Sequence, residues 1–265
     1  MLVENKKYKT IWSDKSKKIK IIDQTRLPFE FIEVELKTLN CSIKAIFEMQ
    51  VRGAPLIGVT AAFGIFLAVK ESSLNKDIIN AGKKLIATRP TAINLKWAVD
   101  KIIKKLLLVP EAKREELAFH LAHELAGEDE NINEQIGNFG SKIIEKIFHK
   151  TKKPVNILTH CNAGWLATVD WGTATSPIYK ARNNNIPLHV WVDETRPRNQ
   201  GSFLTSWELK NENIDHTIIA DNTGGHLMQN GLVDIVITGS DRTTYTGDVC
   251  NKIGTYLKAI AAKEN

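Results

Sequence analysis

The fold of this chain is decided by the stretch Val155-Asn156-Ile157-Leu158-Thr159-His160-Cys161-Asn162-Ala163-Gly164. An apolar run typical of a strand gives way there to a segment with helical spacing. Cys161 is therefore predicted to lie where a strand ends and a helix begins, which is where open α/β sheets place their chemistry. The stretch favours an enzyme over a structural protein.

The same alternation of strand and helix occurs three more times after this point. The predicted strands are Val155–Thr159, Leu188–Val192, His216–Ala220 and Ile235–Thr238. The predicted helices are Ala163–Ala181, Gly201–Lys210, Thr223–Asn230 and Val249–Lys263. Such alternation predicts a parallel sheet with right-handed crossovers. Polar pairs follow the four strands and are expected to line a crevice: His160-Cys161, Asp193-Glu194, Asp221-Asn222 and Asp241-Arg242.

The first half of the chain has a different pattern, with one hairpin and mostly helices. The hairpin is predicted within Thr10–Arg26, where isoleucines flank a polar turn. The predicted helices are Leu39–Met49, Leu56–Val69, Lys76–Ala87, Leu95–Leu108, Glu111–Leu125 and Glu134–Phe148. The acidic stretch Glu128-Asp129-Glu130 separates the last two helices. We therefore expect a helical domain over residues 1–130 and a sheet domain over residues 131–265.

Composition and charge exclude several classes of protein. The net charge of +6 comes mainly from scattered lysines, with no basic stripe, so solvated helix faces explain it better than a nucleic-acid partner. The cysteines Cys41, Cys161 and Cys250 lack the spacing of disulfides or a zinc site, which favours a reducing cytoplasm and no metal. No signal peptide and no apolar run of membrane-spanning length occurs. The sequence predicts a soluble cytoplasmic protein without a membrane partner.

Cys161 and Asp241 are the candidate catalytic residues, and each has an ordinary alternative. Cys161 at a helix N-terminus would be a reactive thiol, but a lone cysteine can also pack as a small apolar residue. Asp241 can act as a general acid if it is buried in a crevice, or it can cap the next helix. Asp248 is better placed to cap a helix that begins at Val249, which leaves Asp241 for the first role.

Two short motifs are suited to binding an anion. In Arg52-Gly53-Ala54-Pro55, a proline at a helix start and a glycine that exposes backbone amides stand beside an arginine. Asn251-Lys252 repeats the idea near the start of the last predicted helix. A third segment, from Asp193 to Gly201, is rich in polar groups of the kind that determine specificity.

Taken together, the motifs closely resemble those of the methylthioribose-1-phosphate isomerases, in order and over nearly the whole chain. The superfamily also contains regulatory subunits of translation initiation factor 2B. The motifs are Arg52-Gly53-Ala54-Pro55, His160-Cys161-Asn162-Ala163-Gly164, Asp193-Glu194-Thr195-Arg196-Pro197, Gln200-Gly201, Asp221-Asn222, Asp241-Arg242 and Gly247-Asp248-Val249-Cys250-Asn251-Lys252-Ile253-Gly254-Thr255. The resemblance implies a helical N-terminal domain with a small β-hairpin, then a Rossmann-like parallel-sheet domain that is truncated here.

The resemblance also implies an activity and a set of site residues. The activity is aldose–ketose isomerisation of methylthioribose 1-phosphate, or of 5-deoxyribose 1-phosphate, in methionine salvage, by a homodimer without cofactor. Cys161 and Asp241 become the catalytic pair, with Asp241 as proton donor and Cys161 as a base at C2 or as a group that holds O2 during a hydride shift. The substrate-binding positions are Arg52, Gly53, Ala54, Arg89, Gln200, Asn251 and Lys252. The alternatives are an inactive fragment, a non-catalytic regulatory protein and a ribose-1,5-bisphosphate isomerase.

Overall fold

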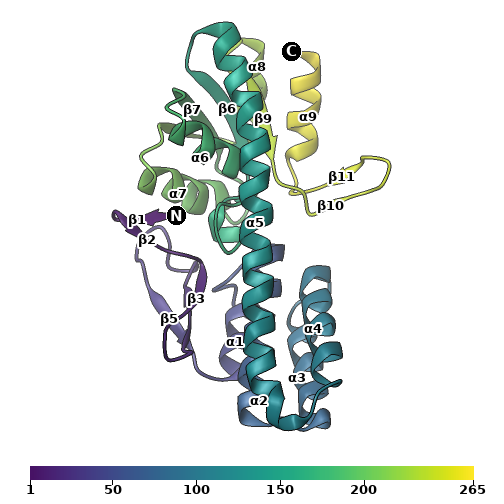
Figure 1. Ribbon diagram of the computed structural model, residues 1–265. Helices are drawn as coiled ribbons and strands as arrows, with labels where there is room; N and C mark the ends of the chain where they lie inside the picture. Colours follow the sequence, from purple (N-terminus) through teal and green to yellow (C-terminus); the bar gives the residue numbers. More distant parts are fainter. The chain divides into compact units, whose positions relative to one another are not determined.

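The computed structural model describes every residue from Met1 to Asn265 (Figure 1). The chain divides into two compact units, and each is described here by itself. Unit 1 consists of Met1–Tyr8, Asn133–Trp165 and Trp171–Asn265. Unit 2 consists of Lys9–Ile132 and Leu166–Asp170. Two short segments are separated from their sequence neighbours: Met1–Tyr8 belongs to unit 1, and Leu166–Asp170 belongs to unit 2. The sequence pattern did not predict either exchange.

Unit 1 is built on a four-stranded parallel sheet. Its strands are β6 (Val155–His160), β7 (Leu188–Asp193), β8 (His216–Ile219) and β9 (Ile235–Thr238), in the order β8-β7-β6-β9. All four predicted strands are confirmed to within one residue at each end. β6 and β7 carry the buried valines, isoleucine and leucine of the sheet, as expected for central parallel strands that are covered on both faces.

The helices of unit 1 follow its strands, with two corrections to the prediction. They are α6 (Ser176–Asn183), the short π-helical turn η2 (Gly201–Thr205), α7 (Ser206–Asn211), α8 (Thr223–Gln229) and α9 (Thr255–Glu264). The helix predicted over Ala163–Ala181 is wrong, because only the 3₁₀ turn η1 (Trp165–Ala167) and α6 are helical. Gly172 has a positive φ of 76° and packs directly on the backbone of Gly164, which folds this segment into a loop.

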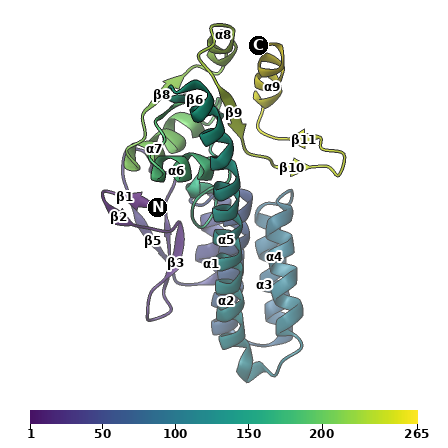
Figure 2. The same ribbon diagram turned by 45° about the horizontal axis from the view of Figure 1, so that its top comes forward.

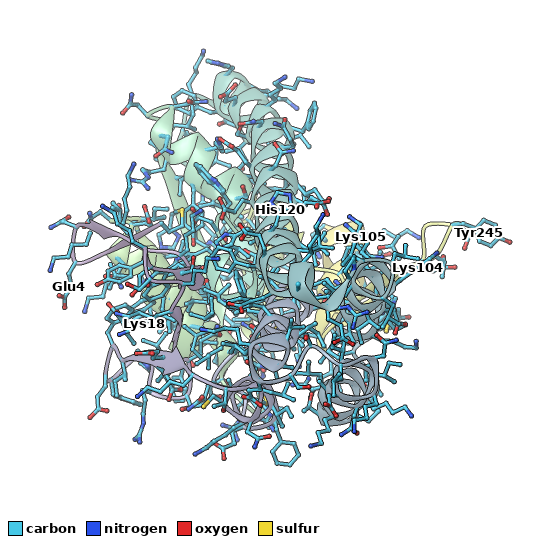
Figure 3. All side chains as sticks on the ribbon, turned by 60° about the horizontal axis from the view of Figure 1, so that its bottom comes forward. Glu4, Lys18, Lys104, Lys105, His120 and Tyr245 are labelled. Carbon is cyan, nitrogen blue, oxygen red and sulfur yellow. The ribbon has the colours of Figure 1, made fainter.

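A hairpin replaces the start of the last predicted helix. β10 (Arg242–Thr243) pairs antiparallel with β11 (Val249–Cys250), and the helix begins only at Thr255. Figures 1 and 2 both show this hairpin extending away from the sheet. Its residues are exposed, and Tyr245 at the tip points into solvent (Figure 3). The two-residue strands β1 (Leu2–Val3) and β2 (Lys6–Lys7) complete the strands of unit 1.

Unit 2 joins a small antiparallel sheet to a helical bundle. The predicted hairpin is confirmed as β3 (Ile11–Ser13) and β4 (Ile19–Ile22), and a third strand, β5 (Glu33–Leu36), pairs with β4. The helices are α1 (Leu39–Phe47), α2 (Ala54–Glu71), α3 (Asn75–Thr88) and α4 (Ile93–Leu106). α2 is apolar and long enough to cross a membrane by composition, but 78% of that window is buried within the protein, so α2 is the core helix of this unit.

The longest helix, α5 (Glu111–Thr151), has residues in both units. The sequence predicted two helices here, separated by Glu128-Asp129-Glu130, but the acidic residues lie inside one continuous helix. Within unit 2, the Asp129 carboxylate accepts a hydrogen bond of 2.7 Å from the Val169 N–H. Asp129 therefore has a structural role inside the helix and is not part of an exposed linker between two helices.

Candidate active site

The order of the strands defines where a ligand site is expected in unit 1. β7 and β8 extend the sheet on one side of β6, whereas β9 pairs with β6 on the other side. Open α/β sheets bind ligands at the carboxyl ends of the strands where the order reverses in this way. His160 at the end of β6 is level with Thr238 at the end of β9. Cys161 and Asp241 therefore follow the two neighbouring strands that flank this point.

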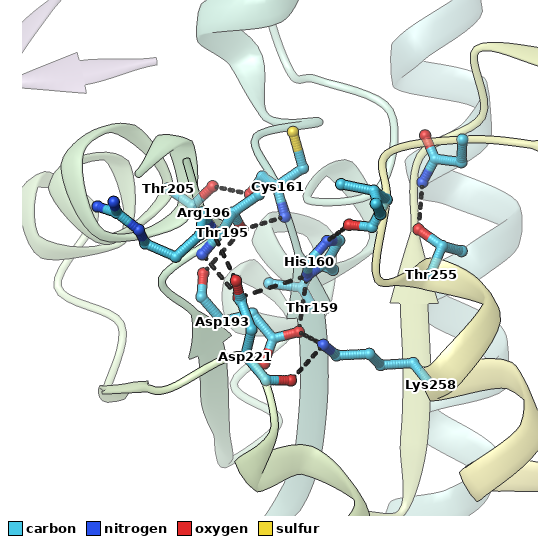
Figure 4. A network of polar contacts seen from close by, with 12 residues as sticks. Thr159, His160, Cys161, Asp193, Thr195, Arg196, Thr205, Asp221, Thr255 and Lys258 are labelled. Carbon is cyan, nitrogen blue, oxygen red and sulfur yellow. Dashed lines mark hydrogen bonds and ion pairs between the residues drawn. The ribbon is translucent and has the colours of Figure 1, made fainter. Parts of the chain in front are cut away.

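Cys161 lies at the tip of β6 in a backbone conformation that is unusual for a residue other than glycine. Its φ is +67°, and both of its backbone groups are held by threonine hydroxyls. The N–H donates to Oγ1 of Thr195 at 2.8 Å, and the carbonyl accepts from Oγ1 of Thr205 at 2.7 Å. Figure 4 shows the half-buried thiol pointing away from the polar groups below it. Such strain, held by neighbouring residues, is typical of functional sites.

The predicted reason for a reactive Cys161 is wrong. No helix begins at Ala163, since η1 starts at Trp165 and α6 only at Ser176. Cys161 is therefore not at the positive end of a helix dipole. Hydrogen bonds between the backbone of Cys161 and the two threonine hydroxyls hold this residue in place instead.

The loop after Cys161 is held by one buried carboxylate, that of Glu208 on α7. Its oxygens accept from Nδ2 of Asn162 at 2.9 Å, from the N–H of Trp165 at 3.2 Å and from the hydroxyl of Tyr179 at 2.8 Å. Burial, and next the negative charge of Glu208, raise the pKa of Tyr179 well above its usual value. Tyr179 therefore remains a hydrogen-bond donor to Glu208. Gly164 packs so closely on Glu208 that a side chain would not fit there.

Asp241 is not buried in a crevice as the sequence predicted. It precedes β10 at the base of the exposed hairpin, where its N–H donates to the carbonyl of Cys250 at 2.9 Å. Its side chain is exposed. Asp248 does not cap a helix either, because it lies in the turn of the hairpin and bonds to Thr246.

The remaining candidate residues of unit 1 lie on the segments that follow β7 and β11. Gln200 opens η2 and is buried, and its Oε1 has no hydrogen-bond partner within the protein. Asn251 donates from Nδ2 to Oγ1 of Thr255 at 3.0 Å, and its Oδ1 would lie 4.0 Å from a side-chain carbon at Gly239, beside the end of β9. Lys252 is half-buried. Asn251 and Lys252 connect β11 to α9 and are not inside a helix start, which corrects the prediction.

The other predicted binding residues belong to unit 2. Gly53 caps α2 with a φ of +92° and packs against the backbone of Ala167, so no other residue fits there. Ala54 is the first residue of α2, and Pro55 the second, one position later than predicted. Arg89 ends α3, and its Nη1 is buried without a partner in the protein. A free guanidinium nitrogen of this kind is suited to an anionic oxygen.

Sequence reasoning missed a polar network directly beneath Cys161 (Figure 4). His160 Nδ1 lies 2.7 Å from Oδ2 of Asp193, and Lys258 Nζ lies 2.9 Å from the same oxygen and 2.5 Å from the carbonyl of Asp221. The Asp221 carboxylate accepts from the N–H of Thr195 and of Arg196, both at 2.8 Å. The imidazole and the two carboxylates present ligand atoms within 4.8 Å of one another, as in metal sites. The Lys258 ammonium supplies a cation to this cluster.

The sequence carried only part of the signal for this network. His160, Asp193 and Asp221 were predicted as polar strand ends lining one wall, and the structure does bring these three together. Asp241, the fourth, is not a member of this cluster. Lys258 is one of two lysines in α9, and nothing in its spacing distinguishes it from the exposed Lys263.

The fold and site thus define an α/β protein with a candidate ligand site at the switch point of a parallel sheet. Residues 50–265 match the model of the initiation factor 2 subunit family. The chain is 57% identical over its whole length to a methylthioribose-1-phosphate isomerase of Paramagnetospirillum magneticum, covering 74% of that protein, and 57% identical to one of Escherichia coli O45:K1, covering 72%.

Solved structures agree with these relatives. The 5-methylthioribose 1-phosphate isomerase of Pyrococcus horikoshii OT3 is 35% identical with a TM-score of 0.87, over 98% of this chain and 73% of that one. A structure titled translation initiation factor eIF-2B, subunit delta, from A. fulgidus is 37% identical with a TM-score of 0.86, over 97% and 75% of the two chains. The chain belongs to the initiation factor 2 subunit family.

Proposed function

We propose that this chain is an isomerase that interconverts 5-methylthioribose 1-phosphate and 5-methylthioribulose 1-phosphate. The observation that carries the proposal is the position of Cys161 and Asp241 after β6 and β9, the two adjacent strands at the switch point of the sheet. The relatives that are 53–57% identical over the full chain are named for this activity, which supports the same reading.

The chemistry needs an acid and a second group on the reacting carbons. The anomeric oxygen of the furanose carries phosphate, so the ring cannot open to a free aldehyde. The ring oxygen must gain a proton as its bond to C1 breaks, one hydrogen must move from C2 to C1, and O2 must lose its proton to become the ketone. The two hydrogens and the electrons balance, so no external oxidant or cofactor is required.

We assign the acid to Asp241 and the second role to Cys161. The backbone hydrogen bond from the Asp241 N–H to the carbonyl of Cys250 fixes the backbone position of Asp241, while its carboxyl group is exposed. Cys161 acts either as the base at C2 or as the group that holds O2 during a hydride shift. Deuterium at C2 separates these routes, because a hydride shift carries the label to C1 whereas a base exchanges it with water.

The phosphate and hydroxyl groups of the sugar need hydrogen-bond donors, acceptors and cations, and the predicted binding residues offer such groups. In unit 1, the Oε1 of Gln200 lacks a donor, and Asn251 and Lys252 supply an amide and a cation. In unit 2, Arg52, the backbone at Gly53 and Ala54 on the α2 N-terminus, and the unpartnered Nη1 of Arg89 are suited to phosphate. We propose that these groups bind the substrate.

The direct test is turnover of methylthioribose 1-phosphate by the 265-residue chain, measured as ketose formation. 5-Deoxyribose 1-phosphate and ribose 1,5-bisphosphate are the comparison substrates. We expect the methylthio and deoxy sugars to react and the bisphosphate not to react. Binding without turnover of any of the three would instead support a regulatory protein like the initiation-factor members of the family.

Asp241→Asn provides the test of the acid. We expect turnover to fall by about 10²–10⁴-fold, because the amide cannot donate the proton to the ring oxygen. Asp248→Asn, on the same exposed hairpin, is the matched control and should retain activity. Near wild-type turnover by Asp241→Asn would show that another group is the acid.

We further propose that the protein works as a homodimer in the cytoplasm, within methionine salvage. Sedimentation velocity of the purified chain measures the first part directly. A single species with the mass of one 29.7 kDa chain would contradict it.

A further inference from the structure

The centre of the network below Cys161, formed by His160, Asp193 and Lys258, is almost completely buried, although all three side chains are titratable. His160, Asp193 and Lys258 are exposed by 1%, 0% and 4% respectively. Buried charges are costly unless they are paired and hydrogen-bonded. These residues come from the ends of β6 and β7 and from α9, so the network joins separate segments of unit 1.

Both nitrogens of the His160 ring face acceptors. Nε2 lies 2.7 Å from the carbonyl oxygen of Ile253, which can only accept, so this nitrogen carries a proton. Nδ1 lies 2.7 Å from Oδ2 of Asp193, and a second proton must lie between those two atoms. The imidazole–carboxylate pair therefore holds two protons and is neutral as a whole, and Lys258 adds its ammonium on the same oxygen.

The network is connected on one side to Cys161. The carbonyl of Asp193 accepts a hydrogen bond from Oγ1 of Thr195 at 3.0 Å, and the same hydroxyl accepts the Cys161 N–H. The Asp221 carboxylate holds the backbone of Thr195 from below. The left-handed backbone of Cys161 thus depends on a residue that the network fixes.

On its other side the network is connected to the loop that carries Asn251 and Lys252. The carbonyl that His160 bonds belongs to Ile253, the residue after Lys252. Gly254 packs against the His160 ring, where a side-chain carbon would lie 2.8 Å from Cε1 and from Nε2. The His160 imidazole therefore links the segment that carries Cys161 to the loop that carries Asn251 and Lys252.

We propose that His160, Asp193 and Lys258 are positioning residues, which hold Cys161 and the Asn251–Lys252 loop in their working arrangement through a doubly protonated imidazole–carboxylate pair. Their role in turnover rests on the proposed isomerase function, whereas the protonation of His160 and the geometry at Cys161 do not. None of the three needs to touch the sugar, and they act through the residues that do.

The protonation is tested on the unaltered chain by ¹⁵N NMR of its histidine side chains near neutral pH, with His160→Gln used to assign the signal. We expect protons on both ring nitrogens of His160. The proposal would be overturned if either ring nitrogen of His160 carried no proton and also accepted none in a hydrogen bond. This result does not depend on whether the chain turns over any sugar.

The positioning role is tested with Lys258→Met and its matched control Lys263→Met, an exposed lysine on the same helix α9. We expect Lys258→Met to lower kcat by about tenfold to a hundredfold with a smaller change in KM, and Lys263→Met to change neither. Lys258→Arg, which restores a cation, should recover part of the loss. Equal kcat values for the folded Met variants would overturn the proposal.

A readout that does not need turnover is the alkylation rate of Cys161, followed by peptide-resolved mass spectrometry. Resolution by peptide matters because the hydroxyl of Thr38 lowers the pKa of Cys41, which favours reaction there as well. Lys258→Met should change the rate at Cys161 severalfold and leave the rate at Cys41 unchanged. An unchanged rate at Cys161 in that folded variant would show that the network does not position the thiol.

Discussion

At the scale of single residues, the thiol of Cys161 is the group whose removal should have the most specific effect. Cys161→Ser keeps the size and the backbone hydrogen bonds to Thr195 and Thr205. We expect kcat to fall by about 10²–10⁴-fold with a much smaller change in KM, because the sulfur acts in the transition state and not in binding. Steady-state kinetics measure both constants. Cys41→Ser, in unit 2, is the control and should behave as the wild type.

Tyr179 provides a pH-dependent test of the hydrogen bonds to Glu208, which hold the loop after Cys161. Because its folded-state pKa is raised well above 10.0, its stabilising contribution is complete below that pH and is lost as the pH rises further. Tyr179→Phe should lower the free energy of unfolding by about 1–3 kcal/mol at neutral pH, since a hydrogen bond to a buried carboxylate is lost. This difference should shrink in alkali.

Urea unfolding of both proteins at a series of pH values measures the trend. The control is Tyr256→Phe, because Tyr256 is 75% exposed and should show no such dependence. A difference between wild type and Tyr179→Phe that stayed constant above about pH 10 would contradict the raised pKa of Tyr179.

How far the site could be predicted depends on what each residue type reveals locally. Cys161 and Asp241 were found because each follows an apolar strand, and the resemblance supplied their roles. Lys258 could not be found, because its partners lie at the ends of other strands. The exposure of Asp241 was missed because burial depends on how the hairpin extends from the sheet, which no local pattern records.

At the scale of secondary-structure elements, the start of α2 is set by Gly53. Gly53→Ala should lower the free energy of unfolding of unit 2 by about 2–4 kcal/mol, because the added carbon meets the backbone of Ala167 and φ is positive. Gly127→Ala, inside α5 with open space around it, is the matched control and should stabilise by about 0.5–1 kcal/mol. Chemical denaturation measures both changes. Equal effects of the two substitutions would contradict the close packing at Gly53.

The elements that were predicted correctly depend on local sequence pattern, whereas the missed ones depend mostly on contacts with distant residues. The four parallel strands are short apolar runs, so local pattern suffices for them. The sequence Ala163–Ala181 has helical spacing, but Gly172 must meet Gly164 and the loop must reach Glu208, so tertiary contacts decide its structure. β5 (Glu33–Leu36) was missed because two of its four residues are glutamates and only Leu36 is buried.

At the scale of the whole molecule, the two units draw on different parts of the chain. Leu166–Asp170 packs with unit 2, where Gln24 Nε2 donates to the carbonyl of Leu166 at 2.7 Å and the Thr10 N–H donates to that of Val169 at 3.0 Å. The same segment directly follows the loop that carries Cys161. A division at a single point near residue 130 therefore leaves this segment out of account.

The exposed hairpin that begins after Asp241 has a consequence for the speed of the enzyme. Because Asp241 is exposed to bulk water, we expect the hairpin to close over the bound sugar during each turnover and to exclude water from the acid. Moving a protruding arm through liquid meets friction, whereas breaking a bond does not. We therefore expect kcat to decrease as glycerol or sucrose raises the viscosity of the buffer. A kcat that is independent of viscosity would show that the chemical step, and not the movement of the hairpin, limits the rate.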